Sequence, residues 1–141
     1  MRKEDKKISD KVFNSFTVNK LSPTTFLFKI DKNNIGKLSK HEVVIKSHYS
    51  TINYKDILIC RGNPGLVRKF PHIPGIDIAG EIVLSKSKKF KIGDKVTAVC
   101  QPTGINTSGC WSEYVKIPDK WIEKIPRDIS LKKAMVIGTA G

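Results

Sequence analysis

The sequence predicts a mainly β fold, an antiparallel, barrel-like domain with one or two short helices. Two observations carry this prediction. Short segments with apolar residues at alternate positions recur along the 141 residues, and turn-forming residues separate them. A chain of this length can also bury one real core but is too short for two domains of ordinary size. We therefore expect a single β domain with few helices.

Three strands are expected in the first 50 residues. Turn-forming residues separate them, at Ser22-Pro23 and along Asp31–Gly36, where Asn and Gly interrupt the apolar pattern. The predicted strands are Lys11–Val18, Thr25–Ile30 and Glu42–Tyr49.

A short helix and two more strands are expected in the middle of the chain. The helix is predicted over Tyr54–Arg61, because the breaking segment Asn63-Pro64-Gly65 follows it. After a tight turn at Pro74-Gly75, strands are predicted over Ile76–Val83 and Val96–Val99. Residues on one face of the first of these strands are Ile76, Ile78, Gly80 and Ile82.

The C-terminal part continues this pattern and then changes. After a loop of small residues at Gln101–Gly109, strands are predicted over Trp111–Ile117 and Trp121–Ile125. From Asp128 to Ile137 the pattern is that of a helix start, with Asp128 or Ser130 available as N-cap.

The chain is strongly basic, with a formal net charge of +13. Such a charge raises nucleic acid as a partner. However, the basic residues are spread along the whole chain and are almost all lysine, whereas bidentate phosphate contacts favour arginine. We therefore expect no nucleic-acid binding beyond a nonspecific, salt-sensitive attraction. The arginines are Arg2, Arg61, Arg68 and Arg127.

Cysteines and the N-terminus indicate a cytoplasmic protein. The three cysteines contain no C-x-x-C pair, which argues against a disulfide framework and favours free thiols. Residues 1–10 are polar and contain Glu4 and Asp5, so they lack the features of a signal or transit peptide and are expected to form a solvated tail. No apolar run is long enough to span a bilayer.

Five motifs, in order and with matching gaps, resemble the medium-chain dehydrogenase/reductase superfamily. They are Asn53-Tyr54-Lys55-Asp56, Phe70–Gly80, Phe90–Val96, Gly109–Val115 and Ile137–Gly141. They are most similar to those of the zinc-independent quinone oxidoreductases and their acrylyl-CoA reductase branch. The resemblance covers residues 42–141 well and residues 11–41 by pattern alone. It implies a GroES-like catalytic domain, a partly open β-barrel, followed by a Rossmann domain that binds NADPH.

This resemblance divides the chain into three parts. Residues 1–10 are the polar tail, residues 11–127 an incomplete GroES-like catalytic domain, and residues 128–141 the start of the helix that leads into a Rossmann domain. A Rossmann site needs a G-x-G-x-x-G turn to meet the pyrophosphate, and none of the ten glycines forms it. We therefore expect an N-terminal fragment, truncated before the Rossmann domain and inactive alone, whose missing half a separate polypeptide can supply.

The resemblance also implies the site residues. Tyr54 is expected to contact the cofactor in the cleft, where its phenol can donate and accept hydrogen bonds. Tyr54 and Asn53 are the candidate catalytic residues, and Tyr54 and Thr139 the candidate cofactor-binding residues. The implied reaction is hydride transfer from NADPH to a conjugated C=C, as in an acrylyl-CoA, or to a quinone.

Structural roles compete with these assignments. Tyr54 can instead pack on the inner face of the short helix with Ile57 and Leu58. Asn53 and Asp56 have the spacing of a capping box, in which each side chain satisfies a free backbone N–H of the helix start. We expect the capping role for Asp56 and leave both roles open for Asn53.

No catalytic metal is expected. The zinc-dependent relatives have a cysteine where this chain has Asn53, and a Gly-His-Glu where it has Gly75-Ile76-Asp77. The three histidines lack a mutual metal spacing. Arg61 and Arg68 are able to meet a phosphate of an acyl-CoA or of the cofactor, although exposed arginines are usually solvated. Cys110 replaces a glycine of the family and adds a side chain where backbones are expected to approach closely.

Three functions therefore stand side by side. The first is the N-terminal part of an NADPH-dependent oxidoreductase. The second is a small basic β-barrel that binds nucleic acid or a partner protein through a lysine cluster. The third is a non-functional gene fragment. The lysines of the proposed cluster are Lys86, Lys88, Lys89, Lys91 and Lys95.

Overall fold

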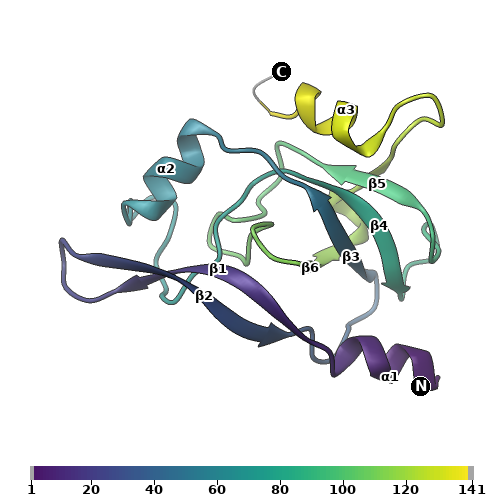
Figure 1. Cartoon of the computed structure of the whole chain (residues 1–141), viewed down its shortest axis with the longest axis horizontal. Helices are drawn as coiled ribbons and strands as arrows, with labels where there is room; N and C mark the ends of the chain where they lie inside the picture. The colour runs from purple at the N-terminus through teal and green to yellow at the C-terminus, as the bar shows by residue number, and fades with distance from the viewer. Residues whose placement is uncertain (1, 140–141) are drawn as a thin grey trace.

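The computed structural model describes residues 2–139 and has a mainly β architecture with three short α-helices (Figure 1). This confirms the predicted fold class. The elements in chain order are α1 (Lys3–Ser9), β1 (Val12–Lys20), β2 (Phe26–Asn34), β3 (Glu42–Tyr49), α2 (Tyr54–Cys60), β4 (Ile78–Ser85), β5 (Lys95–Ala98), β6 (Tyr114–Pro118), the 3-10 turn Asp119–Trp121, β7 (Glu123–Lys124) and α3 (Leu131–Ile137).

The strands form two antiparallel sheets. One is the hairpin β1–β2, which lies along the lower side of Figure 1. The other has five strands in the order β6-β3-β4-β5-β7. Besides its ladder with β2, β1 is linked to the rest of the described chain by single bridges, from Ser15 to Ser112 and from Val18 to His72. Isolated hydrogen bonds add to them, such as that from the Phe16 N–H to the Trp111 oxygen at 2.8 Å. The sheets of the described chain are therefore open, in agreement with the expected partly open barrel.

The main core lies on β3 and β4, the two central strands. Val43 and Ile45 face the largest buried cluster, and Val44 between them faces a second one with Leu84. An irregularity in the pairing sets Val44 opposite Leu84 but Ile45 opposite Ile82. Ile82 and Leu84 therefore serve different clusters although they are two residues apart, which plain strand alternation does not predict.

The N-terminal residues differ from the expected polar tail, because residues 3–9 form helix α1. Glu4 and Asp5 lie in its first turn and Lys6 and Lys7 in its last, which suits the helix dipole at both ends. Ile8 packs against the cluster that contains Val44 and Leu84. One apolar residue in seven gives no periodic signal, so the sequence pattern did not show the helix.

The second strand is also longer than predicted. It continues through residues 31–34, which the sequence indicated as a turn-rich connection. These polar residues pair with residues 12–15 of β1, for example Asn34 with Val12 and Asp31 with Ser15. Most of β2 is exposed, so its polar C-terminal residues do not have to be buried when they join the strand. The length of β2 is therefore determined by its pairing with β1.

Replacement of Gly80 by alanine is expected to destabilise the β3–β4 pair. A Cβ at this position would lie 2.2 Å from the backbone oxygen of Lys46, so the strands must move apart. We expect Gly80→Ala to lower the free energy of unfolding by about 1–3 kcal/mol, the usual cost of overpacking. Chemical denaturation measures it. The control is Gly65→Ala, in which the added Cβ meets only the side-chain oxygen of Asn63, at 3.1 Å. An equal decrease in the free energy of unfolding of both variants would contradict the prediction.

Candidate functional site

The predicted site residues come together where α2 begins and α3 ends. Asn53 precedes α2 and is buried, and Tyr54 is the first residue of α2. Thr139 follows α3 and is partly buried. Both helices lie on the upper side of the molecule in Figure 1, opposite the β1–β2 hairpin.

A buried carboxylate, Asp77, connects these segments. Its Oδ2 accepts hydrogen bonds from the Thr51 hydroxyl at 2.7 Å, the Asn53 amide at 3.1 Å and the Thr139 backbone N–H at 2.9 Å. Its Oδ1 accepts a further hydrogen bond from the Thr139 hydroxyl. The Ser50 hydroxyl donates to the backbone oxygen of Asp77 at 2.6 Å. One side chain thus holds the loop before α2 and the segment after α3.

Asp56 has the capping role expected for it. Its Oδ2 accepts the backbone N–H of Asn53 at 2.8 Å, and its Oδ1 accepts the N–H of Gly75 at 3.2 Å. The Asn53 amide donates to the Thr51 hydroxyl, at 2.9 Å, as well as to Asp77. Asn53 is therefore engaged inside the protein, and its side chain positions the start of α2.

The two buried carboxylates differ in their electrostatics. Burial alone raises the pKa of Asp77, but hydrogen bonds from Thr139, Thr51 and Asn53 outweigh it and hold the pKa below its ordinary value of 3.8. Burial raises the pKa of Asp56, against hydrogen bonds from Asn53 and Gly75. Burial, with both carboxylates nearby, also raises the pKa of the Cys110 thiol. Cys110 is thus an unreactive core residue.

Tyr54 is 74% exposed, so the alternative in which it packs with Ile57 and Leu58 is wrong. Its phenol makes no hydrogen bond within residues 2–139, and the ring is directed to solvent. Ile52 beside it is 76% exposed and Ile57 is 41% exposed. The start of α2 therefore presents an aromatic hydroxyl among apolar side chains.

An aromatic wall adjoins this surface, and the sequence analysis did not connect its residues. Phe16 of β1 and Trp111 pack edge to face with ring centroids 5.4 Å apart. Trp111 Nε1 donates to the backbone oxygen of Thr51 at 3.1 Å, which ties the wall to the loop that Asp77 holds. With Ser50 and Ile52 these residues line an open cavity of about 350 Å³.

The Thr139 hydroxyl already makes hydrogen bonds within the protein. Besides donating to Asp77, its Oγ1 accepts the Cys100 backbone N–H at 3.2 Å. A further ligand would therefore have to displace one of these contacts or meet only the methyl group. The side chain is better suited to holding the segment after α3 on Asp77 than to donating a hydrogen bond to a ligand.

Comparison with known proteins identifies the domain. Residues 39–127 match the alcohol dehydrogenase GroES-like domain. The chain belongs to this family. The candidate site residues Asn53 and Tyr54, with Asp77, thus lie within the matched alcohol dehydrogenase GroES-like domain.

The similar proteins include bacterial oxidoreductases. Quinone oxidoreductase YhfP of Bacillus subtilis is 45% identical over 104 residues, which are 74% of this chain and 32% of YhfP. Acrylyl-CoA reductase AcuI of Ruegeria pomeroyi is 40% identical over 100 residues, 71% of this chain and 30% of AcuI. The chain therefore spans about a third of the length of the curated relatives that it matches.

Solved structures are similar over nearly the whole chain. The Bacillus subtilis YhfP structure with NAD bound has a TM-score of 0.85 and 37% identity, covering 94% of this chain and 40% of YhfP. The YhdH oxidoreductase of Salmonella enterica in complex with NADP has a TM-score of 0.83 and 30% identity, covering 91% of this chain and 39% of YhdH.

Within residues 2–139, no three His, Cys, Asp or Glu side chains gather closely enough to hold a metal ion. The same residues include no helix with the length and apolar character needed to cross a bilayer.

Replacement of Asp77 by asparagine is expected to make the free energy of unfolding less dependent on pH in the acid range. Because its folded pKa is lowered, Asp77 contributes stability that is present above its unfolded pKa and lost as pH falls through the folded value. Asp77→Asn should lower the free energy of unfolding at neutral pH by about 1–3 kcal/mol, since an amide cannot accept all of the donors that face it. Asp77→Asn should also lose less stability than the wild type when the pH is lowered into the acid range.

Denaturation at a series of pH values measures both effects. The control is Asp128→Asn, which removes an exposed carboxylate from the turn before α3. Asp56 has the opposite effect on the pH dependence. Because its pKa is raised in the folded state, the free energy of unfolding decreases as the pH rises through that folded pKa. If Asp77→Asn followed the same profile as the wild type, Asp77 would not be the ionised acceptor described here.

Proposed function

We propose that this domain forms the substrate-side wall of a nicotinamide-dependent reductase that acts on a conjugated C=C, such as that of an acrylyl-CoA, or on a quinone. The observation that carries the proposal is the exposed Tyr54 phenol at the first residue of α2, directly after a loop whose Ile52 lines the cavity with Phe16 and Trp111 and whose Asn53 is held by buried hydrogen bonds. The names of YhfP and AcuI support this substrate class.

The cofactor proposed is NADPH, in keeping with the NADP complex of YhdH. It would supply the hydride when bound. Tyr54 fits a place beside it, because its hydroxyl has no partner within residues 2–139 and can bond to a ligand. Thr139 would border the same space mainly through its methyl group, since its hydroxyl is held by Asp77 and Cys100.

The residues of this chain would serve the reaction by position and hydrogen bonding. Tyr54 can donate a hydrogen bond to the oxygen that gains charge when a conjugated carbonyl compound or a quinone is reduced. Asn53 keeps Tyr54 in place by joining the helix start to Asp77. The rings of Phe16 and Trp111 offer an apolar surface to the planar, electron-poor part of the substrate.

The chain alone is expected to bind NADPH only weakly. None of its ten glycines forms the G-x-G-x-x-G turn that meets the pyrophosphate in a Rossmann site. Fluorescence titration of the purified chain with NADPH should therefore show no saturation at micromolar concentrations, and no reductase activity is expected without a nucleotide-binding domain. Whole YhdH of Salmonella enterica, solved in complex with NADP, is the positive control, and saturable micromolar binding to this chain would contradict the prediction.

A chimera tests the reductase proposal directly. In it, this chain replaces the matching segment of YhdH of Salmonella enterica, the NADP-bound relative with which it shares 30% identity. The chimera should oxidise NADPH in the presence of a quinone or acrylyl-CoA, and Tyr54→Phe should lower kcat/KM roughly 10- to 100-fold, the range for loss of one hydrogen-bond donor to a developing charge.

The matched control is Tyr114→Phe, because Tyr114 packs against Phe13 with ring centroids 5.4 Å apart and lies in a different cluster. This variant should keep at least half of the activity. A folded chimera that binds NADPH but reduces neither substrate would overturn the proposed function.

A further inference from the structure

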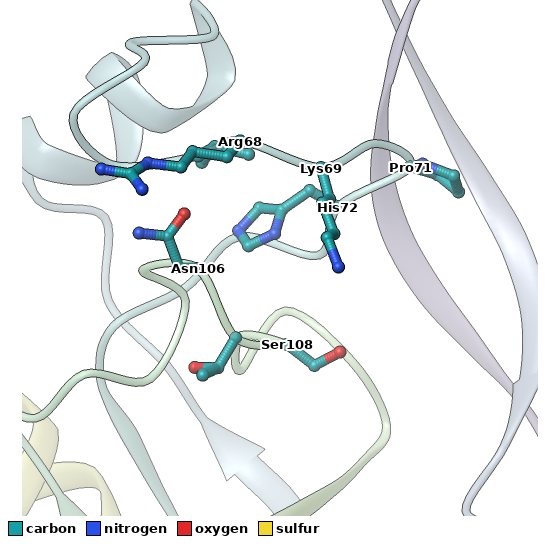
Figure 2. A pocket seen from close by; sticks show the side chains of 8 residues that line it. Arg68, Lys69, Pro71, His72, Asn106 and Ser108 are labelled. Carbon is teal, nitrogen blue, oxygen red and sulfur yellow. The ribbon is translucent and has the colours of Figure 1, made fainter.

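A second cavity, of about 450 Å³, lies between the loop after α2 and the loop before β6 (Figure 2). It uses none of the residues of the proposed reductase site. Its lining contains two cationic side chains, one histidine and three polar side chains, and no acidic one. The lining residues are Val67, Arg68, Lys69, Pro71, His72, Asn106, Thr107 and Ser108.

Backbone hydrogen bonds fix the two loops to each other. The N–H of Asn106 donates to the oxygen of Leu66 at 2.9 Å, and the N–H of Gly109 donates to the oxygen of Ile73 at 2.7 Å. The His72 ring lies between them with Nε2 at 2.7 Å from the oxygen of Gly104. The cavity therefore has a preformed frame, which lowers the ordering cost of binding.

Polar side chains border this frame from both loops. Figure 2 shows Arg68, Lys69 and His72 on one side and Asn106 and Ser108 on the other. Within residues 2–139, neither Arg68 nor Lys69 pairs with a carboxylate at salt-bridge distance. Two exposed cations without a carboxylate partner in the described chain thus border one solvent-open cavity.

We propose that this cavity is a binding site for a phosphate group. A phosphate carries up to two negative charges and three acceptor oxygens, which matches one guanidinium, one ammonium and the amide and hydroxyl donors opposite them. A single carboxylate has one charge and two oxygens and would leave one cation without a partner. The site is also a bounded cavity and not a continuous basic stripe, so it favours one phosphate group over a nucleic-acid backbone.

Titration with inorganic phosphate, followed by the amide NMR signals of the chain, tests the proposal. At about 150 mM NaCl, long-range attraction to the net charge is screened beyond roughly 8 Å. The amide signals of Asn106, Thr107 and Ser108 should shift saturably. Arg68→Gln combined with Lys69→Gln should weaken binding at least tenfold.

The matched control is Lys88→Gln combined with Lys89→Gln, which removes the same charge from an exposed turn elsewhere. It should change the affinity less than twofold, and circular dichroism verifies that both double variants fold. Equal weakening in the two variants, or shifts that do not saturate, would mean that net charge alone attracts phosphate and would overturn the site.

The source of the phosphate is distinguished by a comparison of ligands. Coenzyme A carries a 3′-phosphate that dephospho-coenzyme A lacks. Tighter binding of coenzyme A than of both dephospho-coenzyme A and inorganic phosphate would assign the site to a nucleotide phosphate monoester. Equal binding of coenzyme A and inorganic phosphate would assign it to the phosphate group alone. Binding of neither would overturn the proposal independently of the reductase assay.

Discussion

The position of every candidate site residue depends on the burial of one ionised carboxylate. A charge with no exposure to solvent is costly unless hydrogen bonds replace water, and Asp77 accepts four such bonds from Thr51, Asn53 and Thr139. These donors come from two segments that are far apart in the sequence. Asp77 can be buried only if these donors reach it, and their bonds to Asp77 bring the start of α2 and the end of α3 together.

Tyr54 is exposed, but hydrogen bonds fix the residues on both sides of it in the sequence. Asn53, one residue earlier, is buried by its bonds to Asp77 and Thr51, and Asp56, two residues later, is buried by its bonds to Asn53 and Gly75. Helix α2 has seven residues and would be marginal in isolation. Tertiary contacts thus hold the helix, and the helix start presents an exposed side chain that makes no hydrogen bond of its own within residues 2–139.

Much of the fold could be predicted from the sequence, because apolar alternation and turn residues act locally. β3 was predicted with its observed bounds, Glu42–Tyr49, and the end of α2 before Gly62 follows from the breaking residues. α1 could not be predicted, since Ile8 is its one apolar contact. The polar end of β2 could not be predicted either, because its pairing with Val12 and its neighbours determines it.

The site could be predicted only where its residues are close in sequence. Asn53 and Asp56 are three residues apart, so their capping relation was visible as a spacing. Asp77 is 24 residues from Asn53 and 62 residues from Thr139. No local sequence pattern indicates that it accepts hydrogen bonds from both. Phe16 and Trp111 likewise meet only through the path of the chain. Long-range hydrogen bonds and packing create the site.

One stretch of chain connects the two cavities physically. Residues 73–75 lie along residues 109–111, with N–H groups of Gly109, Cys110 and Trp111 donating to the oxygens of Ile73, Gly75 and Pro74. Gly75 has φ +107, and an added Cβ there would lie 2.6 Å from Trp111 Cδ1 and 2.8 Å from the backbone N of Cys110. The chain can pass behind Trp111 at this distance only because it lacks a side chain. His72 and Ser108, which line the cavity proposed to bind phosphate, come directly before the two paired segments, and Trp111, which lines the other cavity, is the last residue of the second segment. Trp111 in turn donates to the Thr51 oxygen, so a chain of hydrogen bonds joins these paired segments to the loop that precedes Asn53 and Tyr54.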